Sequence, residues 1–228
     1  MEKQIFRIAI DGPAGAGKST IARMAAGKLG FIYVDTGAMY RAIALFCLRQ
    51  GILPKDEEAV SLAVKEAQIT ISHVGGEQRI MLNGEDVSGQ IRTEEVGNTA
   101  STVSAYPAVR AHLLGLQRNL AAGASVIMDG RDIGTCVLPD AETKIFLTAS
   151  PSVRAMRRFK ELKEKGIMCN LQEIEQDIIE RDQRDTSRAA APLKQAEDAV
   201  LVDGSDMTID QVVNAIMDAA ISHGLKVK

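Results

Sequence analysis

The chain has 228 residues, of which 46% are hydrophobic and 25% are charged, and its formal net charge is -3. This composition is typical of one elaborated globular domain, and it excludes a collagen, a coiled coil and a wholly disordered chain. The slight acidic excess, with three Tyr, five Phe and no Trp, argues against a nucleic-acid-binding surface.

Membrane segments and disulfides are not expected. The sequence has no run of about 20 apolar residues, so no membrane partner is predicted. Arg7 and Asp11 interrupt the apolar run near the N-terminus, which argues against a signal peptide and predicts a cytoplasmic protein. The three cysteines are widely spaced, as expected for free thiols in a reducing compartment.

Short apolar runs alternate with helical patterns along the chain. Strands are predicted at 5–10, 31–34, 125–128, 144–148 and 199–202, and helices at 18–29, 39–50, 107–122, 151–165, 171–186 and 209–221. Strands that alternate with helices form a parallel sheet covered on both faces. The sequence therefore predicts an α/β fold with a five-stranded parallel sheet flanked by helices.

The segment 68–91 departs from this alternation. Its apolar residues alternate with polar ones, and two pairs of turn residues separate the apolar groups. The apolar residues are Ile69, Ile71, Ile80 and Leu82, and the turn pairs are Gly75-Gly76 and Asn83-Gly84. This pattern predicts a small antiparallel β insertion.

A phosphate-binding loop follows the first predicted strand, where the sequence fits G-x-x-x-x-G-K-[ST]. The loop residues are Gly12, Pro13, Ala14, Gly15, Ala16, Gly17, Lys18, Ser19 and Thr20. Its glycines let the backbone aim several N–H groups at one anion, and the following helix adds its positive dipole end. Lys18 can reach the β- and γ-phosphates of a nucleoside triphosphate, and Ser19 can bind Mg²⁺ directly. A plain Gly-rich turn is the simpler alternative, but the strand before the loop and the helix after it favour a nucleotide site.

Two further segments place arginine after a predicted strand. The segment 35–41 (DTGAMYR) contains Arg41, and the segment 129–135 (DGRDIGT) contains Arg131. Ligands of open α/β sheets lie beyond the carboxyl ends of the strands, so both segments are expected to converge with the phosphate loop. Arg131 can bind a phosphate through two hydrogen bonds, and Asp129 can hold a water on Mg²⁺. Helix capping and turn capping are the simpler explanations for these two segments.

The region 154–188 is rich in arginine within an acidic protein. Arg181, Asp185 and Arg188 have the i, i+4, i+7 spacing of one helix face, which intrahelical ion pairing alone would explain. The upstream arginines are Arg154, Arg157 and Arg158. They suit either a solvated helix face or a lid that brings arginines onto the phosphates.

Five motifs resemble those of the bacterial cytidylate kinases, which are nucleoside monophosphate kinases of the P-loop superfamily. They are DGPAGAGKST at 11–20, DTGAMYRA at 35–42, STVSAYPAVR at 101–110, DGRDIGT at 129–135 and RDQRDTSRAAAPL at 181–193. The resemblance implies a P-loop kinase fold in a single domain at 1–228. Its core is expected at about 1–60, 103–150 and 189–228, its monophosphate-binding insertion at about 61–102 and its short helical lid at about 151–188.

The same resemblance implies that the protein transfers the γ-phosphoryl group of ATP to CMP or dCMP. The reaction would give ADP and CDP or dCDP in pyrimidine nucleotide metabolism, with Mg²⁺ as cofactor, in a cytoplasmic enzyme expected to be a monomer. Another small-molecule P-loop kinase, acting on UMP, AMP or shikimate, is the alternative within the class. An ATP-dependent switch protein without catalysis is the alternative outside it.

The resemblance also assigns site residues. The acceptor residues are Thr36, Arg41, Ser101, Arg110, Arg131, Asp132, Arg181, Asp185 and Arg188, and the catalytic residues are Lys18, Arg131, Asp132 and Arg158. Arg41 and Arg131 are expected on the acceptor phosphate, while Asp132 faces the cytosine. A carboxylate that accepts from the N4 amino group suits cytosine and leaves unpaired groups against uracil. Arg157 is expected on the donor phosphates, and any of the three lid arginines could contact the transferred group. Thr36 stands where members of the family often have serine, so the hydroxyl is retained.

Overall fold

The computed structural model describes residues 5–75 and 77–226, so Gly76 of the predicted turn and the two ends of the predicted domain lie outside the described residues. The chain packs as two compact units. Unit 1 comprises the residues up to Tyr33 and those from Ala124 on, and unit 2 runs from Val34 to Gly123. The predicted core, insertion and lid are divided by role, and that division stays a prediction.

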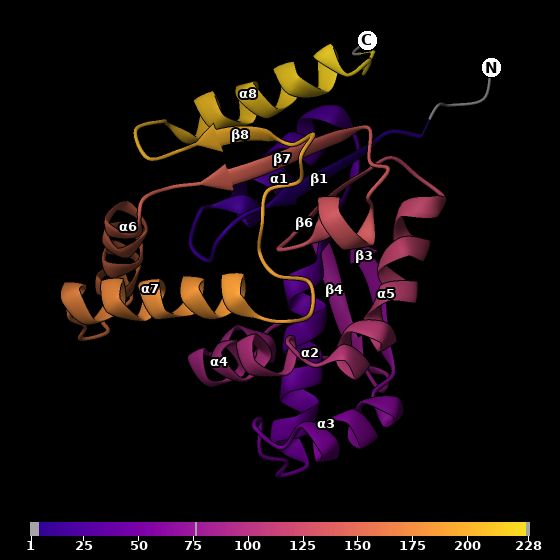
Figure 1. The fold of residues 1–228 in the computed structure, drawn as a ribbon, viewed down its shortest axis with the longest axis vertical. Helices are drawn as coiled ribbons and strands as arrows, with labels where there is room; N and C mark the ends of the chain where they lie inside the picture. The colour runs from indigo at the N-terminus through magenta and orange to yellow at the C-terminus, as the bar shows by residue number, and fades with distance from the viewer. Residues whose placement is uncertain (1–4, 76, 227–228) are drawn as a thin grey trace. The chain divides into compact units, whose positions relative to one another are not determined.

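A five-stranded parallel sheet has the strand order β2-β6-β1-β7-β8 (Figure 1). The strands are β1 (Arg7–Asp11), β2 (Ile32–Asp35), β6 (Val126–Gly130), β7 (Thr143–Thr148) and β8 (Val200–Asp203). The central strand β1 pairs in parallel with β6 and β7, and Ile10 lies opposite both Asp129 and Ile145. The predicted α/β fold is confirmed. Because β1 and β6 are neighbours, the phosphate loop and the DGRDIGT segment leave the same edge of the sheet.

The described residues of unit 1 also form four α-helices, α1 (Lys18–Leu29), α6 (Pro151–Glu164), α7 (Leu171–Ser187) and α8 (Ile209–Ser222). Helices α1 and α8 pack on the sheet, whereas α6 and α7 pack on each other (Figure 1). One buried cluster joins Ile8 and Ile10 of β1 to Ile21 of α1 and Val213 of α8, so these two helices share a core with the sheet. Helix α1 ends as predicted at Gly30, which adopts φ 64° and donates its N–H to Ala26 O. Burial of this continuous apolar surface stabilises β1 and α1, the two elements that flank the phosphate loop.

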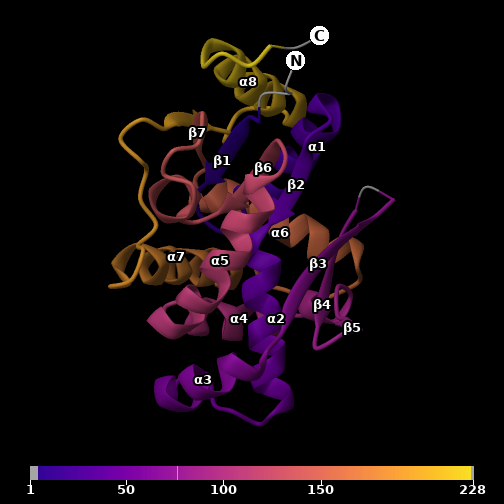
Figure 2. The ribbon, with the colours of Figure 1, turned by 90° about the vertical axis from the view of Figure 1, so that its right-hand side faces the viewer.

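The described residues of unit 2 form a small sheet and four α-helices. The helices are α2 (Thr36–Arg49), α3 (Glu57–Ala63), α4 (Glu94–Val103) and α5 (Pro107–Ala122), and the antiparallel strands are β3 (Ile69–Val74), β4 (Glu77–Leu82) and β5 (Glu85–Asp86). The predicted antiparallel insertion is confirmed, because β3 and β4 run side by side (Figure 2). In their register, Ile69 lies opposite Leu82. Asn83 and Gly84 both have positive φ, at 49° and 85°, as the tight hairpin turn between β4 and β5 requires.

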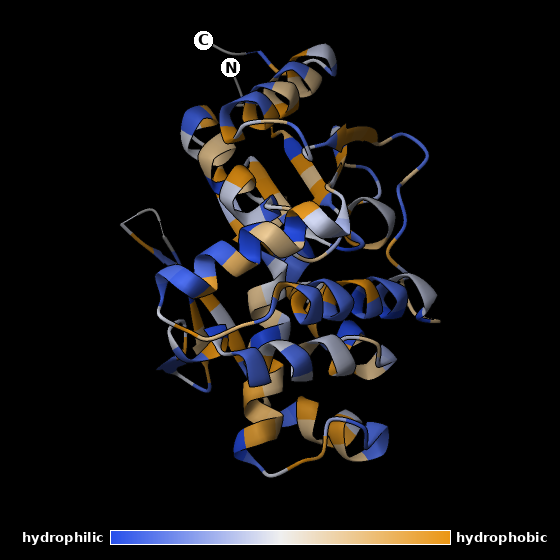
Figure 3. Cartoon of the chain, turned by 90° about the vertical axis from the view of Figure 1, so that its left-hand side faces the viewer, coloured by the Kyte–Doolittle hydropathy of each residue, from blue (hydrophilic) through white to orange (hydrophobic). Residues whose placement is uncertain are grey.

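Amphipathic patterning explains most of the helices. Along α8 the colour changes repeatedly between hydrophilic and hydrophobic (Figure 3). Its Val212, Val213 and Ile216 are buried and belong to the core cluster. Thr208 and Gln211 form a reciprocal capping box at its start.

Two helices of unit 2 were not predicted from the sequence. Helix α4 contains Gly, Asn and Thr, which are weak helix formers, and packing compensates for them. Its Val96, Ala100 and Val103 are buried at helical spacing, and Thr93 caps its first turn. Helix α3 has only seven residues, too few for a clear periodic pattern.

No described helix is long and apolar enough to cross a membrane. Within the described residues, no group of three or more His, Cys, Asp or Glu side chains could hold a metal ion. The three cysteines are free, and Cys47 is buried.

Candidate active site

The phosphate loop of unit 1 is shaped by its glycines. Gly15 and Gly17 adopt φ 75° and 90°, a region that side chains with a Cβ avoid. At Gly12 a Cβ would lie 1.9 Å from the carbonyl oxygen of Leu147, so the loop can leave β1 only because this residue has no side chain. The loop therefore holds an anion-binding turn between a buried strand and the N-terminus of α1.

Lys18 is the buried cation of this loop. Its side chain is 6% exposed, and its Nζ donates to Pro13 O over 2.7 Å. Burial, followed by the positive charge of Arg131, lowers the pKa of Lys18 well below its ordinary value. A bound polyphosphate would raise the pKa of Lys18 again and favour its charged form, so this side chain is suited to bind an anion.

Ser19 and Asp129 bring two oxygen groups together at the start of α1. Ser19 Oγ donates to Asp129 Oδ2 over 3.0 Å, and Tyr33 donates its hydroxyl to Asp129 Oδ1 over 2.9 Å. A hydroxyl and a carboxylate are hard oxygen ligands of the kind that Mg²⁺ prefers, so these residues fit a magnesium site. Tyr33 was missed in the sequence, because nothing in a short β-rich run marks its hydroxyl as a partner of Asp129.

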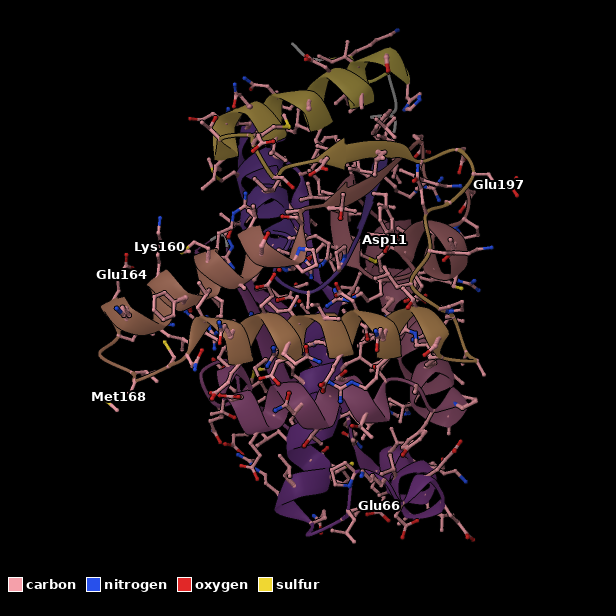
Figure 4. The ribbon with its side chains drawn as sticks, turned by 60° about the vertical axis from the view of Figure 1, so that its left-hand side comes forward. Asp11, Glu66, Lys160, Glu164, Met168 and Glu197 are labelled. Atoms are coloured by element: carbon pink, nitrogen blue, oxygen red, sulfur yellow. The ribbon has the colours of Figure 1, made fainter. Side chains whose placement is uncertain are left out.

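Asp11 was also missed as a site residue, although it opens the first motif. Figure 4 shows it among the ribbons, where it is 5% exposed. Its two carboxylate oxygens accept the backbone N–H groups of Ile133 and Gly134, each over 2.7 Å. Burial raises the pKa of Asp11 to about 6, although these two hydrogen bonds oppose the shift. The carboxylate thus joins the residue before the phosphate loop to the DGRDIGT segment.

An arginine–carboxylate cluster follows β6. Arg131 Nε donates to Asp185 Oδ2 over 2.9 Å, and Arg188 lies 3.7 Å from Asp132 Oδ1. Both carboxylates are buried, at 5% and 4% exposed respectively. Burial alone would raise the pKa of Asp185, but the charges of Arg131, Arg181 and Arg188 lower it below its ordinary value. The structure therefore brings these five predicted residues of unit 1 into one charged cluster.

The prediction that three residues share one helix face is right for Arg181 and Asp185, which lie on α7, and wrong for Arg188, which does not. Helix α7 ends at Ser187, and Arg188 adopts an extended backbone with φ -63° and ψ 140°. Its Nε donates to the carbonyl oxygen of Ala191 over 2.6 Å. Ala191 has φ 46°, a conformation that costs a residue with a Cβ about 1–3 kcal/mol. A strained turn, instead of the helix, sets the direction of Arg188.

In unit 2, Thr36 and Arg41 lie on the first turns of α2. Thr36 is buried, and Asp35 caps the helix by accepting the N–H of Ala38 over 2.9 Å. Arg41 donates to Ile91 O over 3.1 Å. A Cβ on Gly97 would lie 2.9 Å from Arg41 Nη1, so the small residue on α4 leaves room for the guanidinium.

Ser101 and Arg110 lie on α4 and α5 of the same unit. Arg110 is placed over the ring of Tyr40, 5.7 Å from its centre, and donates to Ser104 O over 3.2 Å. Ser101 Oγ is buried and has no hydrogen-bond partner among the described residues. A buried hydroxyl without a hydrogen-bond partner costs free energy, and a polar ligand atom bound beside it would offset this cost.

Asp35 anchors a second group in unit 2 that was missed in the sequence. Its backbone N–H donates to Gln78 Oε1 over 2.8 Å, and Gln78 Nε2 donates back to its carbonyl oxygen over 3.1 Å. Arg92 donates to Asp35 Oδ2 over 3.0 Å. The start of α2 is thus tied to the antiparallel insertion, and the sequence carries no signal for this pairing.

The three arginines of α6 that were predicted to belong to a lid have different surroundings. Arg154 is 3% exposed and is bonded to the phosphate loop and to α7. Arg157 donates to Gly204 O over 2.6 Å. Arg158 has a side chain that is 43% exposed and pairs with Glu161 over 3.0 Å. The predicted contacts of these arginines with phosphates stay predictions.

A comparison with known protein families identifies the family of this chain. The family model described as "Cytidylate kinase" matches residues 8–222. The chain belongs to the cytidylate kinase family. The resemblance that the five motifs indicate is thereby confirmed, and the phosphate loop and the arginine–carboxylate cluster are parts of a kinase of this family.

Individual relatives agree with the family assignment. The chain is 50% identical over 213 residues to a cytidylate kinase from Ligilactobacillus salivarius, covering 93% of this chain and 95% of the relative. It is 49% identical over 218 residues to a cytidylate kinase from Pelotomaculum thermopropionicum, covering 95% and 96%. A crystal structure of an uncharacterized protein from Eubacterium ventriosum has a TM-score of 0.50 at 12% identity, covering 96% of this chain and 99% of that one. That similarity concerns the fold alone.

Proposed function

We propose that this cytidylate kinase family member transfers the γ-phosphoryl group of ATP to CMP or dCMP, giving ADP and CDP or dCDP. One observation carries the proposal. Unit 1 contains a phosphate loop with a buried lysine and, after the neighbouring strand, a separate cluster of arginines and buried carboxylates. A protein that only binds ATP needs the first of these sites, whereas phosphoryl transfer between two nucleotides needs both.

The donor side is the phosphate loop. Its backbone N–H groups and Lys18 would bind the phosphates of ATP, and Thr20 extends the hydroxyl-bearing start of α1. Ser19 would hold Mg²⁺ directly and Asp129 would hold it through a water, since the two groups lie 3.0 Å apart. When bound, the ion neutralises charge on the donor phosphates.

The acceptor residues are proposed by role. Asp132 would accept a hydrogen bond from the N4 amino group of cytosine, with Ser101 and Arg110 as donors to its acceptor atoms. Arg181 and Asp185 would bind the sugar, and Arg41 and Arg131 the phosphate, with Thr36 at the same end. A uracil ring would leave the buried Asp132 carboxylate without its donor, which costs about 1–3 kcal/mol.

Phosphoryl transfer on this site needs alignment more than proton transfer. The attacking atom is an oxygen of the acceptor phosphate, which is already anionic near neutral pH, so no general base is required. Lys18 and Arg131 would stabilise the negative charge that spreads over the transferred group. Arg157 and Arg158 on α6 would add to this charge, and closure of the arginine-bearing helices would exclude water.

An acceptor panel with ADP detection tests the proposal. The purified protein is given ATP, Mg²⁺ and one of CMP, dCMP, UMP, AMP or shikimate, and ADP release is measured against a sample without acceptor. We expect CMP and dCMP to stimulate release strongly and the other acceptors weakly. Preference for UMP, AMP or shikimate would assign a different kinase activity. ATP binding without stimulation by any acceptor would support a switch protein instead.

We further propose that the enzyme acts as a cytoplasmic monomer on these small molecules. The support is its composition and the assignment of all the proposed site residues to one chain. Gel filtration with light scattering measures the mass, and a mass near twice 24.5 kDa would contradict the monomer.

A further inference from the structure

Arg154 is the most completely enclosed arginine of the arginine-rich region, and its guanidinium is already occupied by protein groups. Its Nε donates to Ala149 O over 2.8 Å, and Nη1 donates to Ala14 O over 2.9 Å. The carboxylate of Asp182 accepts two more hydrogen bonds, from Nη1 over 3.1 Å and from Nη2 over 2.5 Å. The five N–H groups of a guanidinium form a fixed fork, so these contacts leave little of Arg154 for a phosphate.

The bond to Ala14 acts on the phosphate loop itself. A trans peptide is planar, so the Ala14 carbonyl and the Gly15 N–H point in opposite directions. By holding the carbonyl, Arg154 fixes the direction of the Gly15 N–H, a member of the anion-binding turn. The arginine stem packs on the same residue, because a Cβ on Gly15 would lie 3.5 Å from Arg154 Cβ.

Asp182 connects this arginine to the acceptor side. It lies on α7 between Arg181 and Asp185, and Asp185 pairs with Arg131. Asp182 is 28 positions away from Arg154, so this pair bridges α6 and α7. A guanidinium that is 3% exposed needs a counter-charge, which makes Asp182 the group that holds Arg154 in place.

We propose that the Arg154–Asp182 pair is a positioning device that couples the phosphate loop to the acceptor helix α7. Binding of the acceptor on Arg181 and Asp185 steadies α7, Asp182 steadies Arg154, and Arg154 holds the Gly15 N–H toward the donor phosphates. Arg154 is thus a positioning residue, and the direct contact with the transferred group falls to other arginines. This inference rests on the proposed function, since it takes CMP as the ligand of α7.

Equilibrium binding tests the coupling without turnover. The probe is the β,γ-imido analogue of ATP with Mg²⁺, titrated by calorimetry into the protein with and without saturating CMP. The ratio of the two dissociation constants measures the coupling. We expect CMP to tighten analogue binding in the wild-type protein by about 5-fold or more. In Asp182→Asn, the ratio should fall toward one.

A matched control is available on the same helix. Asp177→Asn removes the same charge from an exposed position of α7, and it should keep the wild-type ratio. Arg154→Lys keeps a positive charge without the fork, and it should lose the coupling as Asp182→Asn does. The double variant should lose no more than either single one, because both remove the same link. Thermal unfolding of each variant shows that it is folded.

Two results would overturn the inference. One is a wild-type ratio near one, and the other is a wild-type ratio retained in folded Asp182→Asn or, should that variant not fold, in Arg154→Lys. A failure of the proposed function looks different, because the wild-type protein would then show no ADP release stimulated by CMP. Wild-type turnover with unchanged coupling in the variants would refute the positioning role alone.

Discussion

The phosphate loop after β1 and the arginine–carboxylate cluster after β6 are built in opposite ways. The loop is made of backbone, and its glycines and one lysine set its shape. The cluster is made of side chains that meet from distant parts of unit 1, as in the pairs Arg131–Asp185 and Arg188–Asp132. A site made of backbone groups is formed by residues that are adjacent in the sequence. A site made of ion pairs is formed by residues that only the tertiary fold brings together. We therefore expect changes in the loop to affect every acceptor and changes in the cluster to affect particular ones.

The largest effect is expected at Lys18. Lys18→Ala removes the cation of the loop, and kcat should fall by about 10³-fold or more with CMP and dCMP alike. Because burial already lowers the pKa of this lysine, its loss should not lower the melting temperature. Steady-state ADP release and thermal unfolding give the two measurements. A loss confined to one acceptor would break the distinction between loop and cluster.

Asp132 offers the opposite case in the cluster. Asp132→Ala removes the proposed acceptor for the cytosine amino group, and kcat/KM for CMP should fall by about 10- to 100-fold. Binding of the ATP analogue should stay unchanged, which calorimetry checks. Unchanged CMP kinetics would remove Asp132 from the base pocket.

Asp11 belongs to both regions, because it is the last residue of β1 and its carboxylate accepts the backbone N–H groups of Ile133 and Gly134. Its native pKa of about 6 lies above the ordinary 3.8, so protonated Asp11 stabilises the fold at low pH. This contribution is complete below about pH 4 and is lost as the pH rises through about 6. The charged neighbours that act on it are Asp132, which raises its pKa, and Lys18, which lowers it.

Asp11→Asn should remove this pH dependence. Between about pH 4 and 7, wild-type protein should lose about 2–3 kcal/mol of unfolding free energy relative to the variant. Denaturant unfolding across this range gives the difference. Parallel curves for the two proteins would show that Asp11 titrates at its ordinary pKa.

The smallest effect is expected at Ala191, whose positive φ directs Arg188. Ala191→Gly should raise the unfolding free energy by about 1 kcal/mol, because glycine adopts this conformation without strain. The freer turn should also raise KM for CMP a few-fold. Ala189→Gly is the control, since Ala189 is exposed and lacks positive φ, and it should not stabilise the protein. A stabilised Ala191→Gly with unchanged KM would show that the strain has no role in the cluster.

The same difference between backbone and side-chain sites explains what the sequence could predict. The strands, the loop from Gly12 to Thr20 and the antiparallel insertion follow from local periodicity and turn residues, and the structure confirms them. Helix α4 was missed because its stability comes from packing. The helix predicted at 171–186 ends within one residue of α7, so only the i, i+4, i+7 spacing was misleading when it placed Arg188 on the helix face.

Partnerships between side chains were the least predictable part of the site. The Arg154–Asp182 pair and the bonds of Asp11 to the DGRDIGT segment join positions that only the fold brings together. The sequence named Arg154 as a lid candidate beside Arg157 and Arg158, and the structure distinguishes it from Arg158 by burial and by partners.

Gly12 has a practical consequence for anyone who would redesign this enzyme. With the oxygen of Leu147 standing where a methyl group would go, that position offers no freedom to a mutagenesis library. Variation aimed at new acceptors is better spent on the side chains around Asp132 and Asp185, with residue 12 kept constant so that clones do not fail for reasons unrelated to specificity.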